Sequence, residues 1–142
     1  MKGKLAAFFV TGILLAAMTA LGHHSFAGTY DLDQHKTIQG TVTAFMVRNP
    51  HSYLTIEVKD ADGKVQVWGV EWAGATVLRD SGVTQTTLKF GDKVIITGAP
   101  PKGNEAKLLM QRIVRSEDRW TWQGQVGRFK SSNTPLPPVE NQ

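Results

Sequence analysis

The sequence contains no cysteine at all. This absence excludes a disulfide framework, a thiolate metal site and a cysteine nucleophile. A metal ion could be held only by histidine, carboxylate or backbone groups. At 142 residues the chain has room for one domain with its own hydrophobic core.

The sequence also lacks a strong excess of positive charge outside its first residues. Lys2 and Lys4 belong to the N-terminal leader described next, which leaves 14 of the 16 basic residues against 12 acidic ones. Proteins bind nucleic acid through clustered positive charge, so a nearly neutral domain does not favour that partner. We therefore expect no nucleic-acid ligand.

Long apolar runs are missing everywhere except at the start of the chain. There, two lysines precede the uncharged, mostly apolar segment Leu5–Leu21, and Ala20-Leu21-Gly22 forms a small-x-small cleavage pattern. These features predict a signal peptide over residues 1–22 and export to the periplasm, with no membrane span in the mature chain. An uncleaved anchor is the alternative, because the apolar segment is close to the shortest length that spans a bilayer.

The mature sequence alternates apolar and polar residues, the pattern of half-buried strands. It predicts an all-β fold with a single short helix over 74–82, between the third and fourth strands. This order is typical of a five-stranded, antiparallel OB-fold-like barrel, with a five-stranded sandwich or an SH3-like barrel as alternatives. The predicted strands are 37–47, 52–60, 64–72, 93–99 and 106–115.

The segments flanking these strands have different compositions. Residues 23–36 are polar and irregular, so we expect an extended N-terminal arm before a domain that covers 37–130. Trp120, Trp122 and Phe129 make an aromatic C-terminal extension, predicted either to cover the barrel end or to add an edge strand. The proline-containing stretch 131–142 is expected to be a disordered tail.

Several short motifs occur together in a characteristic order. They are His23-His24-Ser25-Phe26, Asn49-Pro50-His51, Asp60-Ala61-Asp62-Gly63-Lys64-Val65, a tryptophan in the third strand and Leu88-Lys89-Phe90-Gly91-Asp92. Over about residues 20–115 the chain thereby resembles a family of small exported proteobacterial proteins of unassigned function. The resemblance implies a periplasmic, barrel-like β domain and supplies no catalytic residue; the stretch 118–130 and the tail depart from it.

The histidine pair behind the leader is the most specific chemical feature. Cleavage after Gly22 would make His23 the first residue, with a free α-amine beside its own imidazole and next to His24. Cu(II) favours such nitrogen donors in square-planar arrays, and a third residue, His51 or His35, could add another. Cleavage before Gly22 would instead make His24 the third residue, which is also an arrangement that chelates copper.

Each of these residues also has an ordinary structural interpretation. The histidine pair could be a polar chain start in solvent, and His51 could cap the Asn-Pro turn through a side-chain hydrogen bond to the backbone. Glu57 and Glu71 are interpreted as residues on the exposed faces of their strands rather than as general acids. The tryptophans fit core or edge positions better than a stacking surface.

The sequence favours a non-enzymatic periplasmic binding module whose ligand is copper or another divalent metal held by His23, His24 and His51. Two alternatives stay open, because the sequence carries no decisive catalytic motif. One is a copper-dependent oxidative enzyme or accessory protein. The other is a structural protein that contacts an envelope partner through its aromatic C-terminal stretch.

Overall fold

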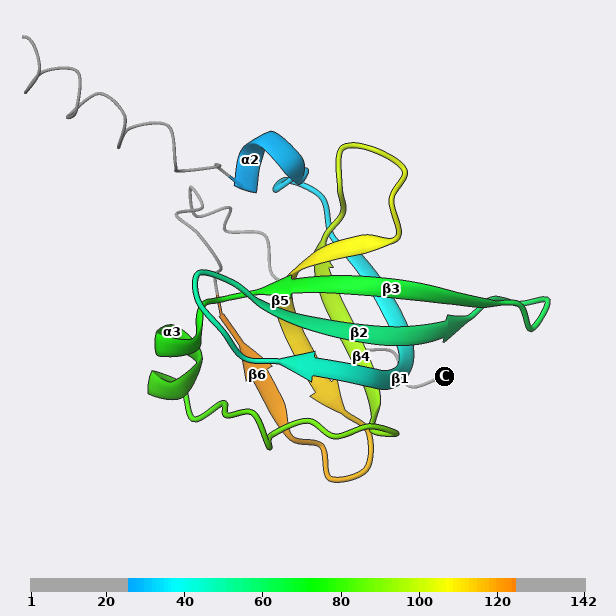
Figure 1. Cartoon of the computed structure of the whole chain (residues 1–142). Helices are drawn as coiled ribbons and strands as arrows, with labels where there is room; N and C mark the ends of the chain where they lie inside the picture. Colours follow the sequence, from blue (N-terminus) through cyan, green and yellow to red (C-terminus); the bar gives the residue numbers. More distant parts are fainter. Residues whose placement is uncertain (1–25, 125–142) are drawn as a thin grey trace, which may run out of the picture.

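The computed structural model describes residues 26–124. They form a mostly β domain with two short helices (Figure 1). In chain order the elements are α2 (Phe26–Thr29), β1 (Lys36–Met46), β2 (Ser52–Lys59), β3 (Val65–Trp72), α3 (Ala75–Asp80), β4 (Lys93–Ala99), β5 (Lys107–Arg115) and β6 (Thr121–Gln123).

The strands form one sheet in the order β3-β2-β1-β4-β5-β6. Neighbours in this order are antiparallel, and a parallel pairing of β3 with β5 joins Gly69–Glu71 to Lys107–Leu109. We call this pairing the seam, because it closes the first five strands into a barrel. In Figure 1, β1, β2 and β3 lie in front of β4 and β5. The closed barrel, with α3 between β3 and β4, confirms the expected OB-like fold.

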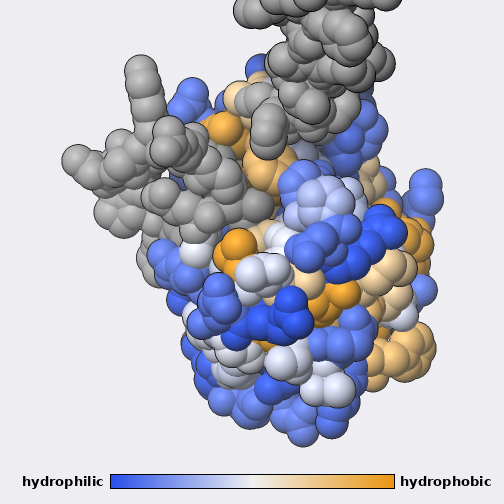
Figure 2. All heavy atoms as spheres, turned by 60° about the vertical axis from the view of Figure 1, so that its left-hand side comes forward, coloured by the Kyte–Doolittle hydropathy of each residue, from blue (hydrophilic) through white to orange (hydrophobic). Residues whose placement is uncertain are grey.

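Strand alternation sets which residues fill the barrel. Along β3, Trp68, Val70 and Trp72 are buried, whereas Val65 and Val67 are exposed. On the side brought forward in Figure 2, hydrophobic patches are interspersed among hydrophilic ones rather than joined into one apolar area. The fully buried interior includes Val42, Leu54, Ile56, Val70, Trp72, Leu78, Ile96, Leu108, Met110 and Ile113.

The aromatic extension contributes an edge strand. Trp122 lies in β6, which pairs antiparallel with β5, and its ring meets that of Trp72 edge-on at 4.9 Å between centroids. Its indole N–H donates to the Ser81 hydroxyl at 3.0 Å, next to the end of α3. The edge-strand interpretation is therefore confirmed for Trp122, and Phe129 lies outside the described residues.

The chain before β1 is more ordered than its polar composition predicts. Residues 26–29 form the helical turn α2, and Tyr30 directly after it is only 2% exposed. Backbone hydrogen bonds join Asp31 to Pro100 and Lys102 to Thr29, both at 2.9 Å, so this segment docks on the β4–β5 loop. The predicted leader, His23, His24 and the tail 131–142 lie outside the described residues. Within 26–124, no helix has the length and hydropathy that a membrane crossing needs.

An ion pair in the β5–β6 loop leads to a first prediction. The Arg115 guanidinium donates to both carboxylate oxygens of Asp118, at 2.8 and 2.9 Å. These hydrogen bonds lower the pKa of Asp118 from its ordinary 3.8 to about 2. A lowered carboxyl pKa means that the pair stabilises the fold above the ordinary pKa and loses this effect as the pH falls through about 2.

Carbon-detected NMR titration should give an Asp118 midpoint near 2 in the native chain. In Arg115→Ala the midpoint should rise towards the ordinary value, because the donors of the two hydrogen bonds are gone. An Asp118 midpoint that is the same in both proteins would contradict the pairing. Because the Asp118 side chain is 53% exposed, the effect on stability should be small.

Candidate functional site

Glu71 is the centre of a cluster of polar side chains at one end of the barrel. Its Oε2 accepts a hydrogen bond from the Tyr30 hydroxyl at 2.7 Å. Its Oε1 lies 2.6 Å from Nδ1 of His51 and accepts from the Tyr53 hydroxyl at 3.4 Å. The Glu71 side chain is only 15% exposed. We call Tyr30, His51, Tyr53 and Glu71 the Glu71 cluster.

Three separate segments deliver these side chains. Tyr53 on β2 and Glu71 on β3 are direct partners in the antiparallel register, so their side chains lie on the same face. His51 ends the loop between β1 and β2, where the Asn49-Pro50 peptide bond is cis. Tyr30 follows α2, in the segment that is hydrogen-bonded to the β4–β5 loop. The cluster therefore forms only once the barrel has formed.

The imidazole of His51 is held on two sides. The ring of Phe26 packs on it with 4.7 Å between centroids, while Glu71 fixes Nδ1. With residues 26–124, Nε2 makes no hydrogen bond, and the side chain is 32% exposed. A carboxylate at one ring nitrogen favours a proton there and leaves a lone pair on the other nitrogen. His51 thus has one ring nitrogen, Nε2, with no hydrogen-bond partner among residues 26–124.

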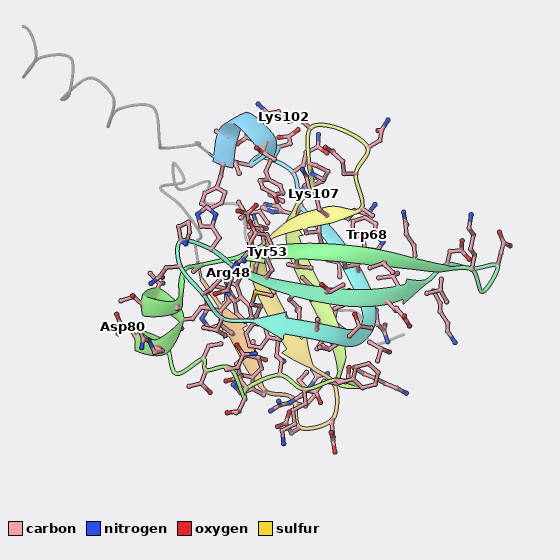
Figure 3. The ribbon with its side chains drawn as sticks, viewed as in Figure 1. Arg48, Tyr53, Trp68, Asp80, Lys102 and Lys107 are labelled. Carbon is pink, nitrogen blue, oxygen red and sulfur yellow. The ribbon has the colours of Figure 1, made fainter. Side chains whose placement is uncertain are left out.

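Both tyrosines of the cluster stay protonated over a wide pH range. Burial, together with Glu71, raises the pKa of Tyr30 far above its ordinary value, and the same causes raise that of Tyr53. A cationic group also lies over each ring. Cζ of Arg48 is 5.0 Å from the ring centroid of Tyr53, and Nζ of Lys107 is 5.7 Å from that of Tyr30. Figure 3 shows Arg48 beside Tyr53. The hydroxyls therefore serve as fixed donors to Glu71.

The structure changes two interpretations made from the sequence. Glu71 does point away from the core, yet it is mostly buried and satisfied by three donors, so describing it as an exposed strand residue is wrong. His51 pairs with a carboxylate rather than capping its turn through the backbone. Glu57, by contrast, is exposed as expected.

The predicted metal ligands are only partly within the described residues. His51 lies in the Glu71 cluster, whereas His23 and His24 fall before residue 26. His35, the alternative ligand, lies just before β1, and its Nδ1 is 2.8 Å from the Gln111 side-chain oxygen. Across residues 26–124, no three His, Asp or Glu side chains gather as a metal site. Of the three predicted metal ligands, this part of the chain contains only His51.

Sequence reasoning missed Tyr30, Tyr53 and the true role of Glu71. Glu71 follows the strand alternation, which correctly predicts its face but not the partners that bury it. Tyr30 left a weak signal, because Phe26 and Tyr30 are four residues apart and lie on one side of the α2 turn, with ring centroids 6.4 Å apart. That spacing indicates a docked apolar face within a polar stretch.

Comparisons with known proteins identify a family for this chain. No curated protein matches the chain. Two crystal structures of the mitochondrial single-stranded DNA binding protein Rim1 from S. cerevisiae are similar to it, at 13% and 15% identity and TM-scores of 0.44 and 0.39. Each covers 58% of this chain, which in turn covers 93% and 92% of theirs. The model of one protein family matches residues 11–110, so the chain belongs to the family of unknown function DUF6152.

Proposed function

We propose that this protein is a periplasmic, non-enzymatic module that binds copper, or another divalent metal, through His51 and the N-terminal pair His23 and His24. The observation that carries the proposal is the hydrogen bond between Nδ1 of His51 and Glu71 at 2.6 Å. Metal-binding histidines characteristically donate their second ring N–H to a carboxylate, which fixes the tautomer and makes the free nitrogen a better ligand.

The surroundings of the pair support this role. Tyr30 and Tyr53 donate to Glu71 and hold its carboxylate in place, while Phe26 holds the plane of the imidazole. A histidine oriented in this way loses little conformational freedom when it binds a metal. The arrangement therefore suits a preorganised ligand better than a solvent-exposed turn residue.

The length of the chain supports a site shared with the histidine pair. Phe26 contacts the His51 ring, and His24 precedes Phe26 by two residues. Two extended residues span at most about 7 Å, so the chain is short enough between His24 and Phe26 for the N-terminal pair to reach His51. The structure gives His35 no comparable contact with Phe26, which favours His51 as the third residue of the site.

The donor set suits copper. After cleavage behind Gly22, the α-amine and imidazole of His23, the imidazole of His24 and Nε2 of His51 would supply nitrogen atoms alone. Cu(II) prefers nitrogen donors in tetragonal arrays and binds them more tightly than other divalent first-row metals do. Export through the predicted signal peptide is part of the proposal, because only cleavage creates the free amine at His23.

The test is a copper titration of the mature chain purified from the periplasm, after intact mass spectrometry has located its first residue. We expect a chain that starts at His23 and binds one Cu(II) with sub-micromolar affinity. His51→Ala should weaken binding by more than Glu71→Gln, for which loss of the carboxylate that holds Nδ1 of His51 predicts a decrease in affinity of about tenfold to hundredfold. Acetylation of the amine should also weaken binding.

His35→Ala is the matched control, because it removes a histidine that is paired with Gln111 instead of with Glu71. It should leave the copper affinity unchanged. The proposal is refuted if His35→Ala and His51→Ala lower the copper affinity equally. It is also refuted if the mature chain starts at another residue, or if the chain does not bind copper. Peroxide formation with copper and a reductant would point to the oxidative alternative.

A further inference from the structure

The β2–β3 hairpin extends beyond the barrel and leaves one edge of β3 unpaired (Figure 1). At the seam, β5 pairs only with Gly69–Glu71. Residues 65–68 therefore have β2 on one side and no strand of the described part of the chain on the other. Two apolar side chains of this segment are exposed, Val65 at 46% and Val67 at 59%. We call residues 65–68 the open edge.

Two hydrogen bonds show which backbone groups of the open edge are free. The N–H of Asp60 donates to the carbonyl of Lys64 at 3.0 Å, so the even-numbered residues of β3 direct their backbone groups towards β2. The N–H of Gly69 donates at 3.0 Å to the loop just before β5, away from β2. By alternation, the N–H and C=O of Val65 and Val67 point the same way as those of Gly69. They have no backbone partner in the described part of the chain.

The sequence of the open edge has none of the features that usually prevent strand pairing. Proteins protect exposed edge strands with charged residues, proline or bulges. Residues 65–70 contain no charged residue and no proline, and β3 pairs with β2 without a register shift. Valine at positions 65 and 67 favours an extended backbone. The open edge is therefore suited to accept another strand.

We propose that two copies of this chain pair through their open edges, antiparallel and about a twofold axis at Gln66. This register places Val65 of each copy opposite Val67 of the other, and each such pair exchanges two N–H···O=C hydrogen bonds. A register with Val67 opposite Val67 would need the edge of Gly69, which β5 already occupies. Because each chain has this edge once, the pairing ends at two copies.

The side chains also match in this register. Val65 and Val67 lie on the outer face of the hairpin, so each valine meets a valine of the second copy and both lose exposed apolar surface. On the other face, Gln66 lies opposite Gln66 of the second copy. An exposed glutamine pair is neutral and adds no repulsion at the axis. The same few residues thus supply both halves of the interface, which favours a second copy over an unrelated strand.

The hairpin turn brings a carboxylate to a basic place on the other chain. Nζ of Lys36 lies over Trp68 at 4.6 Å from the ring centroid, and the register places Lys64 of the second copy opposite the same tryptophan. The turn that precedes this Lys64 carries Asp62, which arrives with it. The Asp62 carboxylate is exposed and makes no ion pair in the described part of the chain. In the dimer it offsets the charge of the two lysines.

The first experiment is sedimentation velocity of the full mature chain with a metal chelator present, which excludes dimers bridged by a metal ion. The interface is short, so we expect a weak dimer whose mass average rises between about 10 μM and about 1 mM. Val67→Lys should raise the concentration of half-dimerisation at least about tenfold, because a lysine on the edge opposes pairing. Val67 is 59% exposed, so the melting temperature at about 10 μM should match that of the native chain.

Val77→Lys is the matched control. It makes the same change at a valine of nearly equal exposure, 57%, that lies on α3 instead of on the hairpin. It should dimerise like the native chain. Asp62→Lys should weaken the dimer at unchanged monomer stability, because it replaces the carboxylate that faces Lys36 with a third positive charge.

A cross-linking experiment tests the register itself. The chain has no cysteine, so Gln66→Cys introduces a single thiol. The proposed axis makes the two copies of this residue a non-hydrogen-bonded antiparallel pair, with Cα atoms about 4.5 Å apart, within the range that a disulfide spans. With oxidised glutathione as the oxidant, we expect a covalent dimer of Gln66→Cys and none of Val77→Cys.

The proposal is overturned if the chain stays monomeric at about 1 mM, or if Val67→Lys dimerises as well as the native chain. It is also overturned if Gln66→Cys and Val77→Cys cross-link at the same rate. A strand of a different protein would then be the remaining occupant of the open edge. Copper affinity should be unchanged in Val67→Lys, so this proposal and the metal proposal stand or fall separately.

Discussion

Trp72→Ala is expected to lower the free energy of unfolding by about 3–5 kcal/mol, as measured by urea denaturation. Trp72 is fully buried and packs against Trp122, at 4.9 Å, and Phe45, at 5.7 Å between ring centroids. Its indole N–H makes no hydrogen bond within residues 26–124. The loss should therefore come from packing and the cavity left behind, without a hydrogen-bond component.

Phe90→Ala is the control for this prediction. This substitution also removes an aromatic side chain, but from a turn in which Phe90 is 83% exposed. It should therefore change the free energy of unfolding by less than about 0.5 kcal/mol. Similar losses for the two variants would mean that Trp72 does not lie in the core. A large loss for Trp72→Ala alone would confirm that Trp72 lies in the hydrophobic core.

Glu71→Ala should destabilise the fold by about 3 kcal/mol even without any metal. The Tyr30 hydroxyl would lose its acceptor while its ring stays buried, and His51 would lose the partner of Nδ1. Leaving a buried donor unsatisfied costs about 1–3 kcal/mol, and hydrogen bonds to a charged group exceed those between neutral groups. Thermal and urea unfolding of the metal-free chain measure this cost.

Glu57→Ala provides the comparison, because it removes the same functional group from the neighbouring strand. Glu57 is exposed, and its carboxylate makes no hydrogen bond or ion pair with residues 26–124. Its loss should stay within about 0.5 kcal/mol. If Glu71→Ala were as mild as Glu57→Ala, the cluster would contribute nothing to stability, and the preorganisation of His51 would lose its support.

The strands could be predicted from the sequence because each is half-buried. Alternation along 52–60 and 64–72 places Leu54, Ile56, Val70 and Trp72 on the interior face, where the structure has them. The order of the elements then favoured a closed barrel over a sandwich. What alternation could not reveal is the seam, because a parallel pairing of three residues leaves no periodic signal in either strand.

The candidate site was harder to predict for the same reason. His51 stood out because its residue type and turn suggest metal chemistry. Glu71 was interpreted as an exposed strand residue, since the partners that bury it, Tyr30 and His51, come from distant segments. Tyr30 was placed in an irregular arm, because a helical turn of four residues is too short to show a helical period. Only tertiary contacts make these residues a cluster.

Glu71 also belongs to the seam, as the register partner of Leu109 on β5. Any local opening that separates β3 from β5 would therefore disturb the carboxylate that orients His51. A metal ion bound at His51, as proposed above, would favour the closed arrangement by mass action and so lower the population of the open form. Protection of the seam amides from hydrogen exchange would then increase with metal occupancy. A metal ion bound at His51 would thus stabilise the closed barrel as well as being the ligand.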